Sequence, residues 1–364
     1  MRLRKLAACA ATSLALVAAG CNVGASGDPP LDPGLLGDAN IQQQLDSLYI
    51  EAKGARETQV VVYGPGQEFY EPAYRKFMQR YPTIKVVSEA IFGEKLNTRL
   101  DQEFATGKHV GSVQTHGGSG TAAAVGANRC ESYKPFTADY QTPDQVGKGD
   151  TYHAFVHFGV GIEYNSDKIT SASAPKGWRE LADPKWKGRL VVNDPTIAGA
   201  SSLMISNLMV ENKLDEEWVR GMFANQPKIV DTAALAEQSV ARGEREIMVV
   251  NNTGVFTTSK NKNMPVAFVF PTAEGARLDT MYVCLLKGGP NPRATKLFAN
   301  WLFTPEAQAE LSETGVFGTR PGTPAPPGFP TLDSIKDKII TQIPVEQQGP
   351  EVQKTIGLVK QIQG

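Results

Sequence analysis

Strand-like and helix-like hydrophobic patterns alternate along the chain. The run Val60-Val61-Val62 is typical of a buried strand, and apolar residues from Phe69 to Tyr81 then recur at helical spacing until Pro82. The same alternation continues with short turns between the elements. The first set of predicted elements is a strand at 59–63, a helix at 69–81, a strand at 84–87, a helix at 96–107 and a strand at 110–114.

A second alternating set follows after residue 190. This repetition predicts two α/β units, each with a mainly parallel sheet. The second set is a strand at 190–192, a helix at 201–210, a strand at 228–230, a helix at 235–240 and a strand at 247–250.

Two extended stretches, 154–164 and 266–286, separate these units, and the second has a break near Glu274-Gly275. We expect them to cross between two lobes, with a ligand cleft between the lobes, because a chain that leaves one lobe and returns makes a two-crossing hinge. Helices at 292–303 and 305–311 would then return to the first lobe, and the proline-rich segment 321–330 would be extended. The prediction assigns 41–160 plus 280–364 to lobe 1 and 161–279 to lobe 2.

The first 20 residues have the layout of an export signal. A basic start is followed by an apolar run, Leu6 to Ala19, that is too short to span a bilayer. Val17 to Cys21 resembles the lipobox of bacterial lipoproteins, which implies cleavage before Cys21 and lipid attachment to its thiol; soluble export with an incidental cysteine is the alternative. Residues 21–40 are rich in Gly, Pro and Asp and predict a flexible tether. No later apolar run is long enough to cross a membrane, so the lipid would be the only anchor.

Composition narrows the class of function. With 41% hydrophobic and 21% charged residues the chain suits a water-soluble globular body. A formal charge of −1 argues against nucleic acid as the main partner, because nucleic-acid binding needs a concentrated basic surface. Cys130 and Cys284 would reach a compartment that permits disulfides, and either a disulfide between them or two buried thiols fits. No metal-ligand spacing is present, so we expect neither metal nor cofactor.

Four further segments carry a family resemblance. They are 41–49 leading into the strand at 60–63, Gly161–Asn165, Trp178–Gly188, and Pro292–Leu302 followed by Pro305–Gln308. In order and spacing the chain resembles the type II solute-binding proteins of bacterial ABC importers, within the group often labelled ferric-iron or family 1 binding proteins. The resemblance implies two α/β lobes and delivery of a small solute to a membrane permease and its ATPase. We therefore expect a monomeric, lipid-anchored protein on the outer side of the cell membrane.

The expected binding residues lie where the strands end, because ligands of open α/β sheets bind outside the carboxyl ends of the strands. Glycines there allow close approach of backbone N–H groups, and helix N-termini favour anionic oxygen. The same residue types also serve ordinary turns and helix caps, so each position has a structural alternative. The predicted ligand-binding residues are Gly66, Gln67, His116, Gly118, Ser119, Thr196, Ser201, Asn251, Asn252 and Thr253.

Three alternatives stay open beside a carrier of a small polar or anionic solute. Ferric iron is one, although iron binders of this group place adjacent tyrosines where this chain has Asn251-Asn252-Thr253-Gly254. A ligand-sensing lipoprotein is the second, because it would bind the same solute with the same fold. An uncharacterised hydrolase is the third. No nucleophile elbow, P-loop, dinucleotide fingerprint or zinc motif is found, so we expect that the protein is not an enzyme.

Overall fold

The computed structural model describes residues 33–340 and 342–363. The predicted signal, Cys21 and most of the predicted tether lie outside the described residues. Residues 33–40 fold instead of continuing the tether, because a 3-10 turn, η1 (Pro33–Leu36), precedes the first helix and Leu36 is buried in a hydrophobic core. The folded body therefore begins a few residues earlier than the sequence pattern predicts.

The first α/β set is built around β1, which lies between β2 and β3 and is parallel to both. Val60 and Val62 pack into one hydrophobic cluster, whereas Val61 and Tyr63 pack into another. This alternation explains why helices cover both faces of the strand. The elements are α1 (Ala39–Gly54), β1 (Gln59–Tyr63), α2 (Gln67–Arg80), β2 (Lys85–Glu89), α3 (Gly93–Thr106), β3 (Val113–Gly117) and α4 (Gly118–Gly126).

The second set is arranged in the same way, with β5 as the central strand between β6 and β7 and parallel to both. It contains two helices, α6 and α8, that the sequence pattern did not predict. The elements are β5 (Leu190–Asn193), α5 (Ala200–Val210), α6 (Glu216–Ala224), β6 (Lys228–Val230), α7 (Ala233–Ala241), β7 (Ile247–Asn252), α8 (Thr253–Asn261) and β8 (Val266–Val269).

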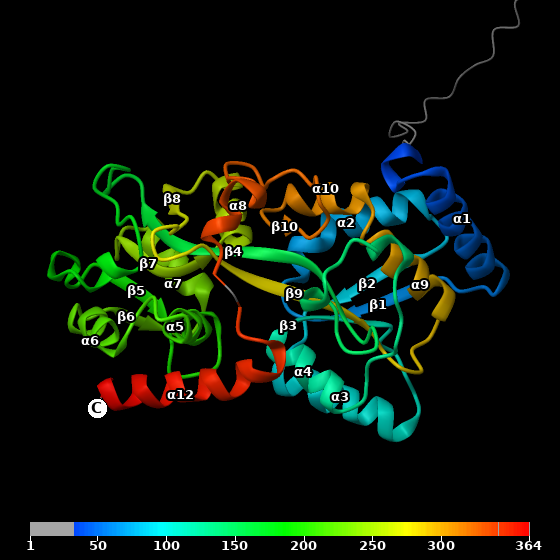
Figure 1. Cartoon of the computed structure of the whole chain (residues 1–364), viewed down its shortest axis with the longest axis horizontal. Coiled ribbons are helices and arrows are strands. Elements are labelled where there is room, and N and C mark those ends of the chain that lie inside the picture. Colours follow the sequence, from blue (N-terminus) through cyan, green and yellow to red (C-terminus); the bar gives the residue numbers. More distant parts are fainter. Residues whose placement is uncertain (1–32, 341, 364) are drawn as a thin grey trace, which may run out of the picture. The chain divides into compact units, whose positions relative to one another are not determined.

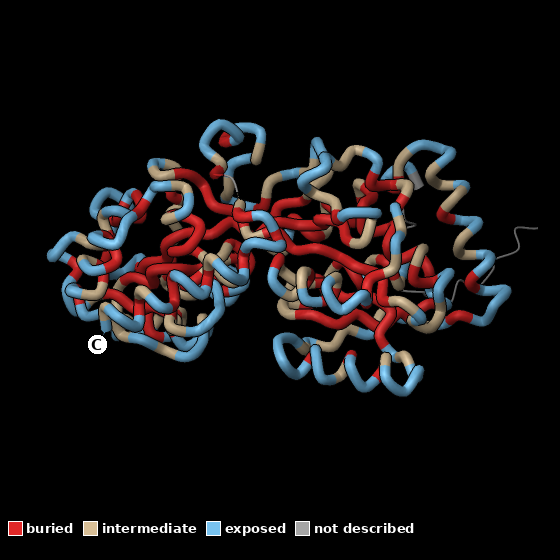
Figure 2. The backbone as a smooth tube through the Cα atoms, turned by 60° about the horizontal axis from the view of Figure 1, so that its bottom comes forward, coloured by how far each residue is buried: buried red, intermediate tan, exposed pale blue. Residues whose placement is uncertain are grey.

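Two long antiparallel strands, β4 (His153–Asn165) and β9 (Arg277–Leu285), join the two sets into one sheet (Figure 1). The strand order is β2-β1-β3-β9-β4-β7-β5-β6, with β8 and the short β10 (Phe317–Gly318) also paired to β4. We call the β2-β1-β3 end with its helices lobe 1 and the β7-β5-β6 end with its helices lobe 2. Each lobe has its own hydrophobic clusters, and Figure 2 shows the buried strands running through both.

The remaining segments pack onto this frame. α9 (Pro292–Trp301) lies on α1, and α10 (Pro305–Ser312) lies on α2, so both return to lobe 1 as expected. α12 (Val345–Gln363) packs against α4 of lobe 1 and against α5 and α6 of lobe 2. The predicted lobe boundaries stay a prediction, since this helix contacts both lobes. Short elements are α11 (Leu332–Ile335), η2 (Phe136–Ala138), η3 (Pro143–Gln145), η4 (Arg179–Ala182), η5 (Pro184–Trp186) and η6 (Lys336–Lys338).

Two predicted strands differ from the structure. β3 spans Val113–Gly117 and not 110–114, because His116 and its neighbours pair with β9. The predicted crossing 266–286 is two strands, of which β8 stays beside the lobe 2 half of β4 and only β9 crosses. In both cases pairing with a strand distant in sequence decides where the extended backbone lies.

Candidate solute-binding site

The ends of β1 and β3 meet at the first turn of α2. Gly64 has φ 155°, and a Cβ there would lie 1.9 Å from the carbonyl oxygen of Thr115, so this turn requires glycine. Gln67 donates from Nε2 to Thr115 Oγ1 at 2.8 Å and accepts from the Tyr74 hydroxyl at 3.1 Å. The Gln67 side chain is thus used inside the protein, and Gly66 offers backbone groups at the same turn.

His116 lies within β3 and not in the loop where we predicted it. Its imidazole packs against Gly120, and its Nδ1 is buried without a hydrogen-bond partner among the described residues. Burial lowers the pKa of His116, so the ring is neutral at neutral pH. Ser119 is exposed at the start of α4, whereas Gly118 is buried against Gln348 of α12. Of these residues, Ser119 is the one whose side chain is open to solvent.

Asn251 is held by a buried carboxylate. It donates from Nδ2 to Glu163 Oε2 at 2.7 Å, and both residues are almost fully buried. Desolvation by burial raises the pKa of Glu163 to about 8, helped by the neighbouring carboxylate of Glu237 and opposed by the Asn251 hydrogen bond. Burial and Glu237 therefore favour a protonated Glu163 at neutral pH, and the Asn251 amide is engaged in an internal hydrogen bond that favours the ionised form.

Asn252 and Thr253 also support the backbone. The Asn252 side chain caps α8 by accepting from the Val255 N–H at 3.0 Å, and Thr253 Oγ1 accepts from the Gly159 N–H at 3.1 Å. These are the structural roles that Asn and Thr commonly take at helix starts. The predicted ligand role of both residues stays a prediction.

Thr196 and Ser201, which follow β5, also use their polar side chains in hydrogen bonds within the protein. Thr196 donates from N and Oγ1 to Asp194 Oδ1, at 2.8 and 2.7 Å. Ser201 is fully buried and donates to Asn193 Oδ1 at 2.6 Å. Because these side chains are already bonded, a ligand at this loop would contact backbone groups of the exposed stretch 197–200.

The first turns of α2 and α8 meet over the middle of β4. The ring of Phe69 in α2 lies edge-on to Phe158 of β4, with centroids 5.4 Å apart. A Cβ at Gly254 in α8 would lie 2.7 Å from Phe158 and 3.3 Å from Phe69, so this approach between the lobes requires a residue without a side chain. The structure thus brings together the predicted loops after β1 and β7. We call this region, around Phe158 and the starts of α2 and α8, the strand-end site.

Two charged residues that we did not predict lie on the same face of β9. Asp279 pairs with Phe158, and Arg277 pairs with Val160, which itself pairs with Asn252 of β7. Directly paired residues of antiparallel strands share a face, so Arg277 and Asp279 face the side on which Phe158 meets α2 and α8. The sequence signal was present: charges at positions i and i+2 interrupt an otherwise apolar strand.

The opposite face of the crossing strands borders a separate cavity of about 830 Å³. Leu278, Thr280 and Tyr282 of β9 line it together with residues of the segment 332–346. His157 Nδ1 and Thr280 Oγ1 lie 2.9 Å apart, and burial lowers the pKa of His157 to about 4. None of the predicted ligand-binding residues lines this cavity.

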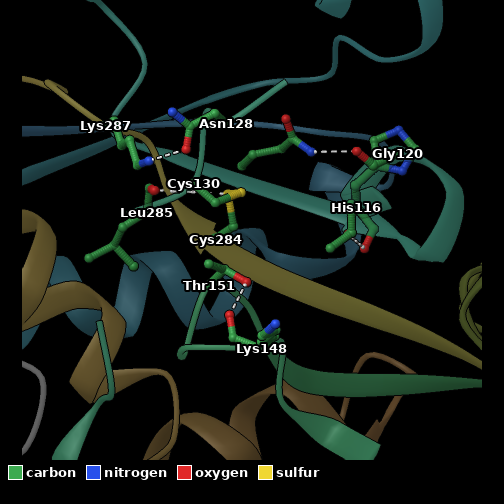
Figure 3. Close-up of a disulfide and its surroundings, with 11 residues drawn as sticks. His116, Gly120, Asn128, Cys130, Lys148, Thr151, Cys284, Leu285 and Lys287 are labelled. Atoms are coloured by element: carbon green, nitrogen blue, oxygen red, sulfur yellow. Dashed lines mark hydrogen bonds between the residues drawn. A yellow bond between two sulfur atoms is a disulfide. The ribbon is translucent and has the colours of Figure 1, made fainter. Parts of the chain in front are cut away.

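A disulfide joins Cys130 to Cys284 beside these elements (Figure 3). It links the segment after α4 to β9, and Lys287 donates to Asn128 on the same side. Of the two arrangements that the sequence left open, the structure shows the bridge. In residues 33–340 and 342–363, no group of three His, Cys, Asp or Glu residues is placed to hold a metal ion. Over the same residues, no helix is long and apolar enough to span a membrane.

Known structures share this arrangement. The fold is similar to iron-bound HitA from Pseudomonas aeruginosa, with a TM-score of 0.69 and 18% identity over 84% of this chain and 99% of that chain. It is also similar to AfuA from Actinobacillus pleuropneumoniae with fructose-6-phosphate bound, with a TM-score of 0.67 and 20% identity over 84% and 97% of the two chains. At these identities the likeness concerns the fold alone, which is that of the two-lobed periplasmic binding proteins.

The sequence matches a family model described as bacterial extracellular solute-binding protein over residues 73–338, more than half of the chain. The chain therefore belongs to this family. It is also similar to iron uptake protein A1 of Synechocystis sp., with 27% identity over 48% of this chain and 49% of the relative. The chain spans about half the length of the relatives that it matches in sequence. The named proteins among these matches are binding and uptake proteins.

Proposed function

We propose that this protein captures a small polar or anionic solute outside the cytoplasm and delivers it to an ABC importer. The observation that carries the proposal is the strand-end site, where the starts of α2 and α8 approach each other across a strand shared by both lobes. Backbone N–H groups at these helix starts suit oxygen atoms of a solute, and the side chains beside them are already fixed by internal hydrogen bonds. A preorganised site of this kind loses little conformational entropy on binding.

The direct test is a thermal-shift screen against a metabolite library, followed by calorimetry on each hit. A solute present at 100 times its dissociation constant stabilises a protein by about 2.7 kcal/mol, which such a screen detects readily. One solute bound per chain, lost in a variant with Gly254→Phe at the contact between the lobes, is the expected result. If no library member stabilises the wild-type protein, the proposal fails.

Ferric iron is a second candidate, and it is favoured by the names of the relatives. The residues of the site offer little to a hard trivalent cation, because the polar side chains of Asn251 and Thr253 are neutral and already bonded. Tyr70 and Tyr74 lie beside Gly66 and Gln67, but burial raises the pKa of both and disfavours phenolate. Adding ferric citrate to metal-stripped protein separates the two candidates. A phenolate-to-iron absorption band with one iron per chain would establish iron as the cargo.

The lipid anchor and the monomeric state belong to the same proposal. If Cys21 carries the lipid, wild-type protein stays with the membrane after a salt wash and Cys21→Ala moves to the soluble fraction. A Cys21→Ala variant that remains with the washed membrane would contradict the anchor. Co-purification with a permease and its ATPase would distinguish an importer component from a sensor.

A further inference from the structure

The Arg277 guanidinium carries hydrogen-bond donors that the protein leaves unused. Its side chain is only 1% exposed, and its ion-pair partner is Asp279, which receives a hydrogen bond from Nη2. Nε and Nη1 are both buried and have no hydrogen-bond partner among the described residues. Buried, unsatisfied donors on a charged group destabilise a folded protein, so this arrangement needs an explanation.

The packing around Arg277 does not explain why a charged residue is buried there. The residue opposite it on β4 is Val160, which belongs to the hydrophobic cluster of lobe 2. A methionine of similar length would fill such surroundings without unsatisfied donors, and replacing buried ion pairs by apolar residues is often neutral or stabilising. Structural need alone therefore does not account for a guanidinium at this position.

The position of Arg277 and Asp279 in the sheet is informative. Along the sheet they lie between the start of α4, where Gly117 pairs with Met281 of β9, and the start of α8, where Asn252 pairs with Val160. The Asp279 side chain is 24% exposed, so solvent reaches one end of the pair. A solute at the strand-end site would thus lie next to a buried cation whose donors are free.

We propose that Arg277 binds the anionic group of the solute, a carboxylate or a phosphate. Asp279 holds the guanidinium in place and accepts a hydrogen bond from a neighbouring hydroxyl or ammonium group of the same solute. This inference rests on the proposed function and specifies the class of solute that the site takes. Guanidinium groups suit both anions, because their planar N–H donors match the oxygen atoms of carboxylates and phosphates.

The test uses pairs of probes that differ in the anionic group. Glycerol 3-phosphate is compared with glycerol, glucose 6-phosphate with glucose, and succinate with 1,4-butanediol, all at one ionic strength set with sodium chloride. We expect at least one anionic probe to raise the Tm of the wild-type protein while its uncharged counterpart does not. The phosphate and carboxylate arms distinguish the two kinds of anion.

Variants then assign the effect to Arg277. Arg277→Met should raise the Kd for the stabilising anion by about 10- to 100-fold, the loss expected for a hydrogen bond to a charged group. Arg220→Met, which removes an exposed arginine of α6 on the surface, is the matched control and should leave Kd unchanged. The double variant Arg277→Met/Asp279→Asn should keep or raise the Tm measured without anion, whereas a purely structural ion pair predicts a lower Tm.

The proposal is overturned if no anionic probe stabilises the wild-type protein, or if Arg277→Met binds the anion as tightly as wild type. Uncharged solutes that bind wild type and Arg277→Met equally would also overturn it, while leaving the solute-binding function intact. Failure of that broader function has a different signature, namely no response of the wild-type protein to any member of the metabolite library.

Discussion

At the scale of single residues, polar side chains at the strand ends serve the fold before they serve a ligand. Gln67, Ser201, Asn251, Asn252 and Thr253 all make internal hydrogen bonds. Helix caps and ligand contacts call for the same residue types, so the sequence alone could not separate the two roles. Residues with buried polar atoms that lack an internal hydrogen-bond partner, such as Arg277, are therefore better indicators of ligand contact.

The cap at α8 leads to one prediction. Asn252→Ala should lower the free energy of unfolding by about 1 kcal/mol, because it removes the side-chain acceptor of the Val255 N–H. Asn252→Ser, which can still cap, should retain most of the wild-type stability in the same urea titration. Equal stability of Asn252→Ala and wild type would show that the cap contributes nothing.

Glu163 leads to a prediction about pH. Its pKa in the folded protein, about 8, lies above the ordinary value of 4.5. At pH values between these two, the folded state therefore keeps a proton that the unfolded state has released. The unfolding free energy should therefore fall as pH rises from about 4.5 to about 8. Glu163→Gln removes this loss and should be more stable than wild type at pH 8.5, by on the order of 2–5 kcal/mol, and similar to it at pH 4.5.

Urea unfolding at the two pH values measures the effect. Glu217→Gln, which changes an exposed carboxylate of α6, is the control and should leave the pH dependence as in wild type. The Lys262 ammonium faces Glu237 from the end of α8 and is kept in all variants. A Glu163→Gln protein that loses stability with pH as steeply as wild type would exclude Glu163 as the source.

At the scale of elements, the disulfide joins two segments that are far apart in sequence, the segment after α4 and strand β9. The backbone of Cys130 pairs with that of Leu286 in an isolated antiparallel β-bridge, and Cys284 lies in β9 opposite Gln114 of β3. The bond closes a loop of 154 residues that contains β4 to β8, and therefore every strand of lobe 2. A long closed loop restricts the unfolded chain, which is where a disulfide has most of its effect in the chain-entropy model.

Removing the bond tests this contribution. The double variant Cys130→Ser/Cys284→Ser should lose up to about 5 kcal/mol of unfolding free energy. Wild type treated with dithiothreitol should show the same lowered Tm, whereas the variant should not respond to the reductant. An unchanged Tm of wild type whose disulfide is shown by mass spectrometry to be reduced would contradict the prediction.

Local patterns predicted most elements of both α/β sets but missed those that depend on distant partners. β1 and α2 were found because their apolar spacing is local. The start of β3 was misplaced because its pairing with β9 joins residues more than 160 positions apart. α12 contains Pro350 and was not predicted, since its burial depends on helices of both lobes. For the same reason Arg277 and Asp279 were missed, because only the sheet brings them next to Phe158.

At the scale of the whole molecule, the lobes share one sheet and few connections. β4 and β9 run between them, and the segment before α12 adds a third link, with Ile340 in a lobe 2 cluster and Val345 in a lobe 1 cluster. Such a construction permits rotation of the lobes about the shared strands while each core stays intact. The family to which the chain belongs binds solutes, and a rotation of this kind would close the lobes around a bound solute.

Small-angle scattering tests this motion. A saturating solute found in the screen should lower the radius of gyration, because the lobes close as rigid bodies. Gly254→Phe should prevent the approach of α8 to α2 and abolish the change. Identical scattering curves with and without a solute confirmed by calorimetry would mean that binding occurs without closure.

The order of strands in the shared sheet also dictates when each part can fold during synthesis. β3 needs β9 as its neighbour, and α1 and α2 need α9 and α10, so the earliest part of the chain to emerge waits for residues 277–312. By contrast, β4 to β8 lie within residues 153–269 and pair with one another, so they can assemble as soon as they emerge. The apolar strands made first are therefore the last to be covered, and until then they are exposed to aggregation.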